Sequence, residues 1–563
     1  MRLAFDIEAN GLSEVIIEKK GTVTPEGDDI FCLCAEDVDT GETWTFLRGE
    51  MFKGVDLLRK ADLLIGHNIL MYDIPMLERY HGPINTKVLD TLLVSRMMYP
   101  DRQDHPLGNN GLKAWGESLG CPKGDFHDFS QLSKEMVKYC KQDVNVNVKI
   151  YHAQKDFIKK NTKSLKLEHK VARLISDQIV NGFGFNMPKA EELEQELLME
   201  KVEIEDNLGQ IFPPITEERY SDKTGKRLKD KITIFNPGSR KQIASRLGTK
   251  YNWNPPVTPK GNPKVDEAVL KKIPYPEAKE LVRYFAITKL LSQVEDWINR
   301  AHVSRDGRIH GGVNTQGTVT GRMTASQPNL QQVSGDPRAR SLFIPKKTWV
   351  QVGVDASGLE ARLLASRMAR WDDGEFADQV LTKDIHTVNQ KAAGLPDRDS
   401  AKTFFYALIY GAGDLKIGQI VGSGPKKGKE IKNKYLKSMP ALKQLLANVE
   451  WQVQRKGTIT LLDGREVPCR AAHKALNVQL QGDGAMLMKL AQVLFHRSLK
   501  PFSGQVNFMA TVHDEWQLEC DPIIADIVGT LGCQAIKRSG EILQCNIDMD
   551  GEYRVGKNWS ECH

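Results

Sequence analysis

The sequence predicts a multidomain protein that combines α/β and α+β architecture, and three observations support this. The chain has 563 residues, too many for one hydrophobic core, which indicates roughly three to five packed units. Strand-like runs next to carboxylates occur near both ends and in the middle, at 2–6, 349–354 and 508–520. Long segments of helical pattern lie between them, such as 168–180 and 277–298.

Composition narrows the class of protein. A hydrophobic content of 40% and a charged content of 27% are ordinary for a soluble globular protein. A formal charge of +6 permits a nucleic-acid partner without requiring one. The nine scattered cysteines show no zinc-site spacing, and their odd number argues against a full disulfide framework. With no export signal and no long apolar stretch, we expect a cytoplasmic protein without membrane association.

Acidic residues in the first 150 positions form the first candidate site. Asp6 and Glu8 follow a short strand with one residue between them, so both side chains lie on one face of an extended chain. Asp73 follows a second strand-like run, and Tyr139 and Asp143 share one face of a helical segment. Hard divalent cations take oxygen ligands, so these four carboxylates would suit a pair of Mg²⁺ ions with Tyr139 orienting a water molecule.

Each of these residues alone is more often a helix cap or a solvated surface group, and only the ordered set points to a metal site. Asp90 is interpreted as such a helix-start residue rather than a ligand.

Carboxylates in the middle and near the C-terminus form the second candidate site. Asp355 follows the strand-like run 349–354, and Asp514 and Glu515 lie between two apolar stretches. Asp355 could also cap the helix that follows it, and a carboxylate pair between strands is often only a solvated turn. As a metal site, Asp355 and Asp514 would hold two Mg²⁺ ions for phosphoryl transfer, with Glu515 as a supporting acid.

A helical segment at 397–413 carries a stripe of cations and aromatics. Arg398, Lys402, Tyr406 and Tyr410 recur every four residues up to Gly411. The two cations would neutralise the phosphates of a nucleoside triphosphate, and Tyr406 would pack against its sugar and base. His386 is a candidate additional phosphate donor.

These segments resemble the polymerase motifs of family A DNA polymerases, in order and spacing. The stretches DASGLEARLLA, DIHTVNQ, AKTFFYALIYGAGDLKIGQIVG and the ending GKNWSECH are similar to those of the enzymes of T-seven-like bacteriophages. The resemblance extends over nearly the whole chain. Its N-terminal part is similar to a proofreading exonuclease domain with four acidic ligands and a tyrosine.

The resemblance implies roles for individual residues. Metal ligands would be Asp355, Asp514 and the backbone carbonyl of Ala356, and Glu360 would fill the space that a ribose 2′-hydroxyl needs. His513 would touch the primer end. Arg322 and Gln481 would lie along the minor groove, where every correct base pair offers similar acceptors, so contacts there test pair shape without favouring a sequence.

The resemblance also implies an architecture. A ribonuclease H-like 3′–5′ exonuclease domain would be followed by a right-hand polymerase of thumb, palm and fingers. The expected bounds are 1–155 for the exonuclease domain, 156–300 for the thumb, 301–370 and 475–563 for the palm, and 371–474 for the fingers. A basic run at 425–437 in the fingers is usually a solvated helix face and here would also suit template phosphates.

One segment departs from the family pattern. Phage enzymes that borrow host thioredoxin as a clamp carry a long insertion in the thumb, whereas the matching segment here, 213–235, is short. Its basic residues, among them Lys226, Arg227 and Lys229, predict a hairpin that grips DNA directly. Thioredoxin dependence is therefore not expected.

The functional prediction is a template-directed DNA polymerase with 3′–5′ proofreading, acting in the cytoplasm of an infected bacterium. Two Mg²⁺ ions are expected at each site, with Mn²⁺ as a substitute. The partners would be primer–template DNA, dNTPs, a phage helicase–primase and a single-strand-binding protein. Two alternatives stay open: a single-subunit RNA polymerase, against which the exonuclease carboxylates and Glu360 argue, and a DNA-binding or exonuclease protein with an inactive palm.

Overall fold

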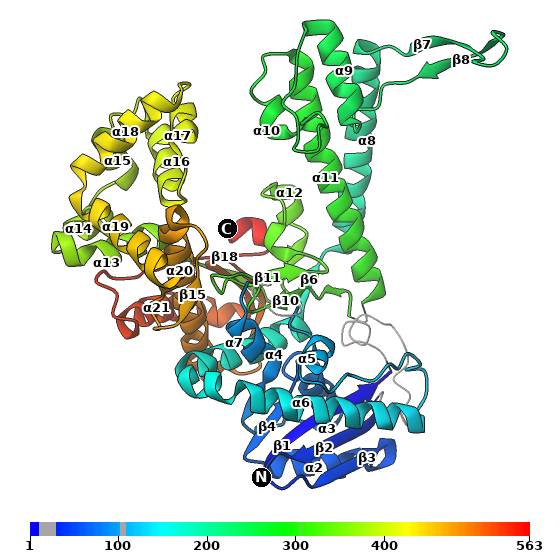
Figure 1. Cartoon of the computed structure of the whole chain (residues 1–563), viewed down its shortest axis with the longest axis vertical. Coiled ribbons are helices and arrows are strands. Elements are labelled where there is room, and N and C mark those ends of the chain that lie inside the picture. Colours follow the sequence, from blue (N-terminus) through cyan, green and yellow to red (C-terminus); the bar gives the residue numbers. More distant parts are fainter. Residues whose placement is uncertain (11–29, 102–107, 305) are drawn as a thin grey trace. The chain divides into compact units, whose positions relative to one another are not determined.

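The structure, a computed structural model, describes residues 1–10, 30–101, 108–304 and 306–563. These residues form two compact units (Figure 1). The first comprises 1–184, 308–332 and 344–563, and the second comprises 185–307 and 333–343. Among the helices of the described residues, none is both long and apolar enough to cross a membrane.

The N-terminal part of the first unit is built on a five-stranded sheet of order β3-β2-β1-β4-β5. Its strands are β1 (Arg2–Ala9), β2 (Ile30–Asp37), β3 (Thr43–Leu47), β4 (Leu63–Gly66) and β5 (Val88–Asp90). The β1–β2 and β2–β3 pairs are antiparallel, and the β1–β4 and β4–β5 pairs are parallel. The surrounding helices are α2 (Met51–Lys60), α3 (Asp73–His81), α4 (Thr91–Met98), α5 (Leu112–Ser118) and α6 (Lys134–Lys160).

Alternation along β1 decides which face of this sheet carries the acids. Leu3, Phe5 and Ile7 point to the core that is shared with α2 and α3. Ala4 points to the opposite core, which includes residues of α4 and α6. Because side chains alternate in a strand, the even-numbered Asp6 and Glu8 lie on the α6 face, where Sγ of Cys140 on α6 lies 3.8 Å from Oδ2 of Asp6. Asp90 caps α4 by accepting from the amides of Leu92 and Leu93, which confirms its reading as a helix-start residue.

The central part of the first unit is built on a four-stranded antiparallel sheet of order β16-β17-β13-β18. Its strands are β13 (Val350–Ala356), β16 (Val506–Val512), β17 (Glu515–Cys520) and β18 (Gly551–Gly556). Helices α13 (Leu359–Asp372), α20 (Ala475–Ser498) and α21 (Ala525–Ile542) contribute to its core. At Gly532, an added Cβ would lie 2.9 Å from Cγ1 of Val354, so glycine permits the close approach of α21 to β13.

A helical region lies between α13 and α20. It contains α14 (Glu375–Thr382), α15 (Ile385–Ala393), α16 (Arg398–Ile409), α17 (Asp414–Ile420), α18 (Pro425–Ser438) and α19 (Pro440–Lys456), followed by β14 (Thr458–Thr460) and β15 (Glu466–Pro468). The basic run 425–437 is helical, as its pattern predicts. The remaining elements of the first unit are α7 (Thr162–Asn181), β6 (Phe183–Phe185), β9 (Arg308–Ile309), β10 (Gly312–Asn314), β11 (Thr324–Ser326) and β12 (Phe343–Ile344). One residue of β6, Phe185, and one of β12, Phe343, are counted with the second unit.

The second unit is mostly helical. It contains α8 (Met187–Ile211), α9 (Arg240–Tyr251), α10 (Glu267–Leu270), α11 (Pro276–Val303), α12 (Pro337–Arg340) and a hairpin of β7 (Ile215–Tyr220) and β8 (Arg227–Thr233). Helices α8 and α11 pack together, and the Tyr284 hydroxyl donates to Glu205 at 3.2 Å. The expected boundary at residue 155 falls inside α6, and α7 belongs to the first unit.

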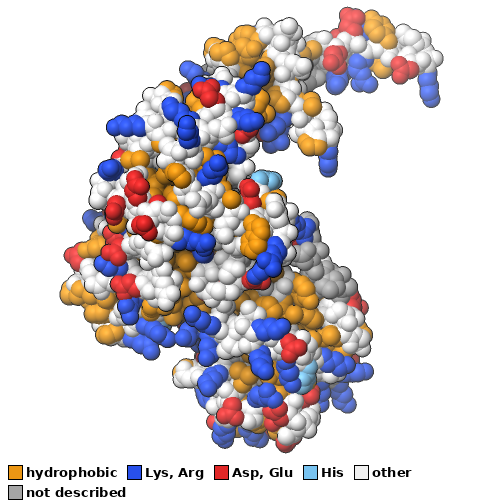
Figure 2. Space-filling view, turned by 60° about the vertical axis from the view of Figure 1, so that its left-hand side comes forward, with side chains coloured by type: hydrophobic (Ala, Val, Ile, Leu, Met, Phe, Trp, Pro, Cys, Tyr) orange, Lys and Arg blue, Asp and Glu red, His pale blue; other side chains and the backbone are white. Residues whose placement is uncertain are grey.

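The hairpin forms as the sequence predicts, but its surface differs from a purely basic one. Arg227 pairs with Glu218 and Asp230, and Lys231 pairs with Glu217. Apolar side chains are also exposed along 213–235, namely Ile215, Tyr220, Leu228, Ile232 and Ile234. Basic, acidic and apolar groups are mixed along this projection (Figure 2).

Candidate active sites

Four carboxylates converge on the α6 face of the N-terminal sheet, and we call them the N-terminal acid cluster: Asp6, Glu8, Asp73 and Asp143. The carboxylates of Asp6 and Glu8, on β1, approach within 4.8 Å of each other. Asp73 begins α3, and its Oδ1 accepts from the Ile7 amide at 3.1 Å, which anchors α3 to β1. Asp143 lies on α6 and is only 2% exposed.

The electrostatics of the N-terminal acid cluster indicate a missing positive charge. Burial, followed by the neighbouring carboxylates, raises the pKa of Asp73 to about 7 and that of Glu8 to about 8. Burial also raises the pKa of Asp6 well above its ordinary value, with Asp73 and Asp143 adding to the shift. The buried Oδ1 of Asp143 has no hydrogen-bond partner among the described residues. Carboxylates are the ligands that hard divalent cations prefer, so this set fits such ions.

Tyr139 lies one helical turn before Asp143, and a residue that the sequence did not single out joins them. The Lys123 ammonium pairs with Oδ2 of Asp143 at 2.8 Å and lies 4.9 Å from the centre of the Tyr139 ring. Lys123 comes from the segment between α5 and α6, where the sequence has no periodic pattern to mark it. It brings a cation into the acid cluster.

Two further carboxylates meet at the central sheet, and we call Asp355 and Asp514 the central acid pair. Asp355 lies near the end of β13, and the amide of the next residue, Ala356, donates to the Asp514 carbonyl at 3.1 Å. Asp514 lies in the two-residue turn that joins β16 to β17, where His513 adopts a φ of 56°. The helix after Asp355 has Gly358 at its N-cap position, so the alternative reading of Asp355 as that cap is wrong.

The central acid pair also shows raised pKa values. Burial, then Asp514, Glu515 and the β18 residue Glu552, raises the pKa of Asp355 to about 7. The pKa of Asp514 is also raised, mainly by burial. The donor set is again carboxylate oxygen, which fits a divalent cation.

Glu515 faces Asp355 across the β13–β17 pair, but its carboxylate is occupied elsewhere. Oε1 accepts from the Trp559 indole at 2.9 Å and from the Gln517 amide, and Oε2 lies 2.7 Å from Nδ1 of His563. The side chain therefore anchors the C-terminal residues, while its charge also raises the pKa of Asp355. Its role as the supporting acid stays a prediction.

The predicted stripe on α16 is largely present. The helix ends at Ile409, so Tyr410 is its C-cap and not part of its last turn. His386, on α15, lies 6.0 Å from Tyr406 between ring centres. Arg398 makes a bidentate pair with Asp384 at 2.7 and 3.0 Å, a partner that the sequence did not identify. Lys402 is exposed on the same helix.

A pocket joins Asp514 of the central acid pair to residues that the resemblance placed along the DNA. Its lining includes Arg322, Glu360, Tyr410, His513 and Asp514. The Tyr410 hydroxyl donates to Glu360 at 2.9 Å, and Arg322 approaches the same carboxylate at 3.4 Å. Gln481, also predicted to lie along the minor groove, is partly buried on α20.

Comparisons with known proteins agree with this geometry. Residues 216–561 match the family model described as DNA polymerase family A. The chain is 32% identical to the DNA-directed DNA polymerases of Enterobacteria phage T3 and Escherichia phage T7, over 100% of both chains in each case. Each alignment spans 718 positions, more than the 563 residues here, so these relatives carry segments without a counterpart in this chain.

A solved structure shows the same fold. It is described as the POL domain of Pol1 from M. smegmatis in complex with DNA primer-template and dNTP, and it matches with a TM-score of 0.81 at 17% identity, over 99% of this chain and 96% of that one. The family model and the phage relatives favour the DNA polymerase reading over the RNA polymerase alternative. The chain belongs to DNA polymerase family A, as a DNA-directed DNA polymerase of the phage type.

Proposed function

We propose that this polymerase has two separate active sites. The central acid pair would carry nucleotidyl transfer from dNTPs to a primer 3′-hydroxyl, and the N-terminal acid cluster would carry 3′–5′ exonuclease cleavage. One observation carries the proposal: carboxylates with raised pKa values gather on two different sheets of the first unit. Bound cations would favour the ionised form of the carboxylates in each group.

In this proposal the N-terminal sheet and its helices form the ribonuclease H-like exonuclease domain. The central sheet forms the palm, helices α14–α19 form the fingers, and the second unit forms the thumb. As in the solved relative, the bound substrates would be primer–template DNA and a dNTP. A helicase–primase and a single-strand-binding protein stay predictions from the family resemblance.

At the central site, Asp355, Asp514 and the carbonyl of Ala356 would hold two Mg²⁺ ions, with Mn²⁺ as a substitute. Such ions activate the attacking hydroxyl and neutralise the leaving pyrophosphate. The protein contributes fixed geometry, because Asp355 is held by β13 and Asp514 by a tight turn that is hydrogen-bonded to Ala356. Glu515 would act as a positioning residue by tying β17 to the C-terminal residues.

The incoming nucleotide would be bound from α15 and α16. Lys402 and His386 would contact the phosphates, and Tyr406 would pack against the sugar. Arg398 would also contact the phosphates, by exchanging its exposed ion pair with Asp384 for one with a phosphate. Its planar guanidinium matches the geometry of a phosphate as well as that of a carboxylate. Glu360, held by the Tyr410 hydroxyl, would leave no space for a ribose 2′-hydroxyl.

The primer–template would contact the pocket and the hairpin. Arg322 and Gln481 would follow the minor groove of the new base pair, and His513 would touch the primer end. The exposed Lys226 and Lys229, with Arg227, would bind backbone phosphates.

At the N-terminal site, Asp6, Glu8, Asp73 and Asp143 would hold two Mg²⁺ ions, and Tyr139 would orient the water that attacks the terminal phosphodiester. Lys123 would position Tyr139 by keeping its ammonium beside both the ring and Asp143. Cleavage then occurs on a different sheet from synthesis, as proofreading requires.

The test is a primer-extension assay with a 5′-labelled primer, given either dNTPs or NTPs, together with degradation of a single strand without nucleotides. The proposal expects extension with dNTPs alone and stepwise shortening from the 3′ end when Mg²⁺ is present. Extension with NTPs at a similar rate would contradict the role of Glu360. Shortening without extension would indicate that the central site is inactive.

A further inference from the structure

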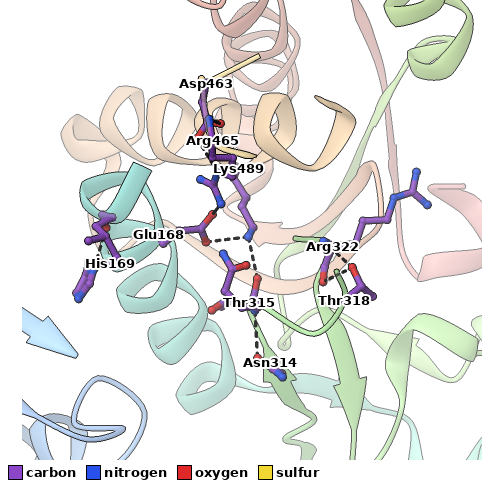
Figure 3. Close-up of polar contacts among 11 residues, drawn as sticks. Glu168, His169, Asn314, Thr315, Thr318, Arg322, Asp463, Arg465 and Lys489 are labelled. Carbon is purple, nitrogen blue, oxygen red and sulfur yellow. Dashed lines mark hydrogen bonds and ion pairs between the residues drawn. The ribbon is translucent and has the colours of Figure 1, made fainter. Parts of the chain in front are cut away.

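A buried cluster of four charged residues lies under the loop that carries Arg322. Glu168 of α7 accepts from Arg465 at 2.7 Å and from the Lys489 ammonium of α20 at 2.7 Å (Figure 3). Arg465 also donates to Asp463 at 2.7 Å. Lys489 makes one more contact, a 2.8 Å hydrogen bond to the backbone carbonyl of Thr315. The cluster thus joins α7, the β14–β15 turn, α20 and the segment after β10.

The cluster is deeply buried and balanced in charge. Glu168 is 0% exposed and Lys489 is 2% exposed. Burial would raise the pKa of Glu168, but the ammonium of Lys489 and the guanidinium of Arg465 outweigh it and lower that pKa. Two acids and two bases offset one another, so no net charge is buried.

Such a cluster is a poor way to gain stability, because desolvating ions costs about as much as their attraction returns. A packed apolar group of similar volume would often serve stability as well. An ion cluster instead imposes a specific geometry, because the Lys489 ammonium must lie where both Glu168 and the Thr315 carbonyl can accept hydrogen bonds from it. This geometry fixes the distance between α20 and the loop that carries Thr315 and Arg322.

The loop from Asn314 to Arg322 is closed by its own hydrogen bonds. The Arg322 amide donates to Oγ1 of Thr318 at 3.0 Å (Figure 3). The Gly317 amide donates to the Arg322 carbonyl at 3.1 Å. At Gly321, whose φ is +76°, an added Cβ would lie 2.9 Å from Cε of Met486 on α20. A loop this tight moves as one piece, so a shift at Thr315 reaches Arg322.

We propose that Lys489 is a positioning residue that holds the Asn314–Arg322 loop through the Thr315 carbonyl and thereby sets how strictly Arg322 tests the newly formed base pair at the primer end. The proposal rests on the minor-groove role proposed for Arg322. Lys489 also lines the pocket that contains Arg322, but its ammonium is bound to Glu168 and to the Thr315 carbonyl.

The experiment uses the full chain with Asp6→Ala and Glu8→Ala, so that exonuclease cleavage does not mask mispairs. Extension of matched and mismatched primer ends is measured as kcat/KM. Lys489→Met, of similar length but without a donor, is expected to lower the matched-to-mismatched ratio by about tenfold, since small misplacements of a contact group cost this much or more. Lys500→Met, an exposed lysine just beyond α20, is the matched control and should leave the ratio unchanged.

The combination with Arg322→Ala separates positioning from stability. If Lys489 acts through Arg322, adding Lys489→Met to Arg322→Ala should cause no further loss, because coupled residues are not additive. A loss in the double variant equal to the product of the single losses would overturn the proposal. If Lys489→Met alone does not fold, Glu168→Gln combined with Lys489→Met removes one charge of each sign and should show the same ratio.

Failure of the inference is distinguishable from failure of the proposed function. If Arg322→Ala reduces discrimination while the folded Lys489 variants do not, the positioning role is wrong and the role of Arg322 stands. If Arg322→Ala leaves discrimination unchanged, both are wrong.

Discussion

The N-terminal acid cluster and the central acid pair use the same chemistry in different surroundings. The first gathers four carboxylates from β1, α3 and α6 around one lysine, and three of its four acids are less than 8% exposed. The second places two partly exposed carboxylates at a strand end and a turn, with Glu515 diverted to the C-terminal residues. The cations expected to meet its substrate lie on α16.

This difference indicates where each site obtains its positive charge. The N-terminal acid cluster has an excess of buried negative charge that one lysine does not balance, so metal ions would complete it before any substrate arrives. The central acid pair carries less charge and is partly exposed, with Asp514 lining a pocket, so the arriving triphosphate and its cations would complete it together. We therefore expect the first site to depend more on metal for its own structure.

The largest effects should come from removing ligands. Asp514→Ala is expected to lower primer extension by about a thousandfold or more while leaving single-strand degradation nearly intact, since metal-bound charge stabilisation is worth several kcal/mol. Asp6→Ala with Glu8→Ala should do the reverse. Both activities are measured on the same labelled oligonucleotides, with circular dichroism to confirm folding. Loss of both activities in a folded variant would show that the two sites are not separate.

Local patterns in the sequence were enough to predict much of both sites. Alternation in β1 placed Asp6 and Glu8 on one face, and the four-residue spacing placed Tyr139 with Asp143. Contacts between distant segments were not predictable in this way. Lys123 reaches Asp143 from an irregular segment, and Glu515 is taken by Trp559 and His563, 44 and 48 residues further along. Such contacts depend on packing and carry no periodic signal.

Metal should stabilise the protein more at high pH than at low pH. Glu8 and Asp73 have pKa values raised from 4.5 and 3.8 to about 8 and about 7, so the folded state holds these protons more tightly than the unfolded chain. Without metal, the free energy of unfolding therefore falls as the pH rises from about 4 to about 8. Mg²⁺ binds the deprotonated form and should restore about 2.7 kcal/mol at a hundred times its dissociation constant.

The measurement is thermal melting with Mg²⁺ or with a chelator, at pH 5.5 and pH 8. The gain from Mg²⁺ should be larger at pH 8, and most of it should disappear in the variant with Asp6→Ala and Glu8→Ala. Asp355→Ala should remove a smaller part, because Asp355 belongs to the less buried pair. An equal loss in the two variants would remove the proposed difference between the sites.

Lys123→Met should weaken only the exonuclease, by about tenfold, because one charged hydrogen-bonding partner of Asp143 and the cation beside the Tyr139 ring are lost. Lys113→Met, an exposed lysine on α5, is the matched control. Cleavage rates of a labelled single strand are compared at saturating Mg²⁺, with primer extension measured alongside. Unchanged cleavage in Lys123→Met would mean that this lysine pairs with Asp143 only while no metal or substrate is bound, and has no role in cleavage.

The smallest effect should come from the hairpin, which lies outside both sites. Replacing Lys226, Arg227 and Lys229 by Ala removes up to three phosphate contacts and should shorten the DNA made per binding event by about threefold, more at raised salt, because each contact releases counterions. The rate at which a short single-stranded oligonucleotide is degraded should stay the same, since that substrate needs only the N-terminal site. Replacing Glu217 and Glu218 by Gln, on the opposite strand of the hairpin, is the control and should lengthen the product or leave it unchanged.

Added thioredoxin should not change the product length. The exposed Ile232 and Ile234 are apolar side chains that a protein clamp could bind, so the outcome is not fixed in advance. A specific interface with such a clamp would usually bury about 800 Å² on each partner. A large gain with thioredoxin that Ile232→Ser and Ile234→Ser abolish would show that the hairpin binds a protein instead of DNA.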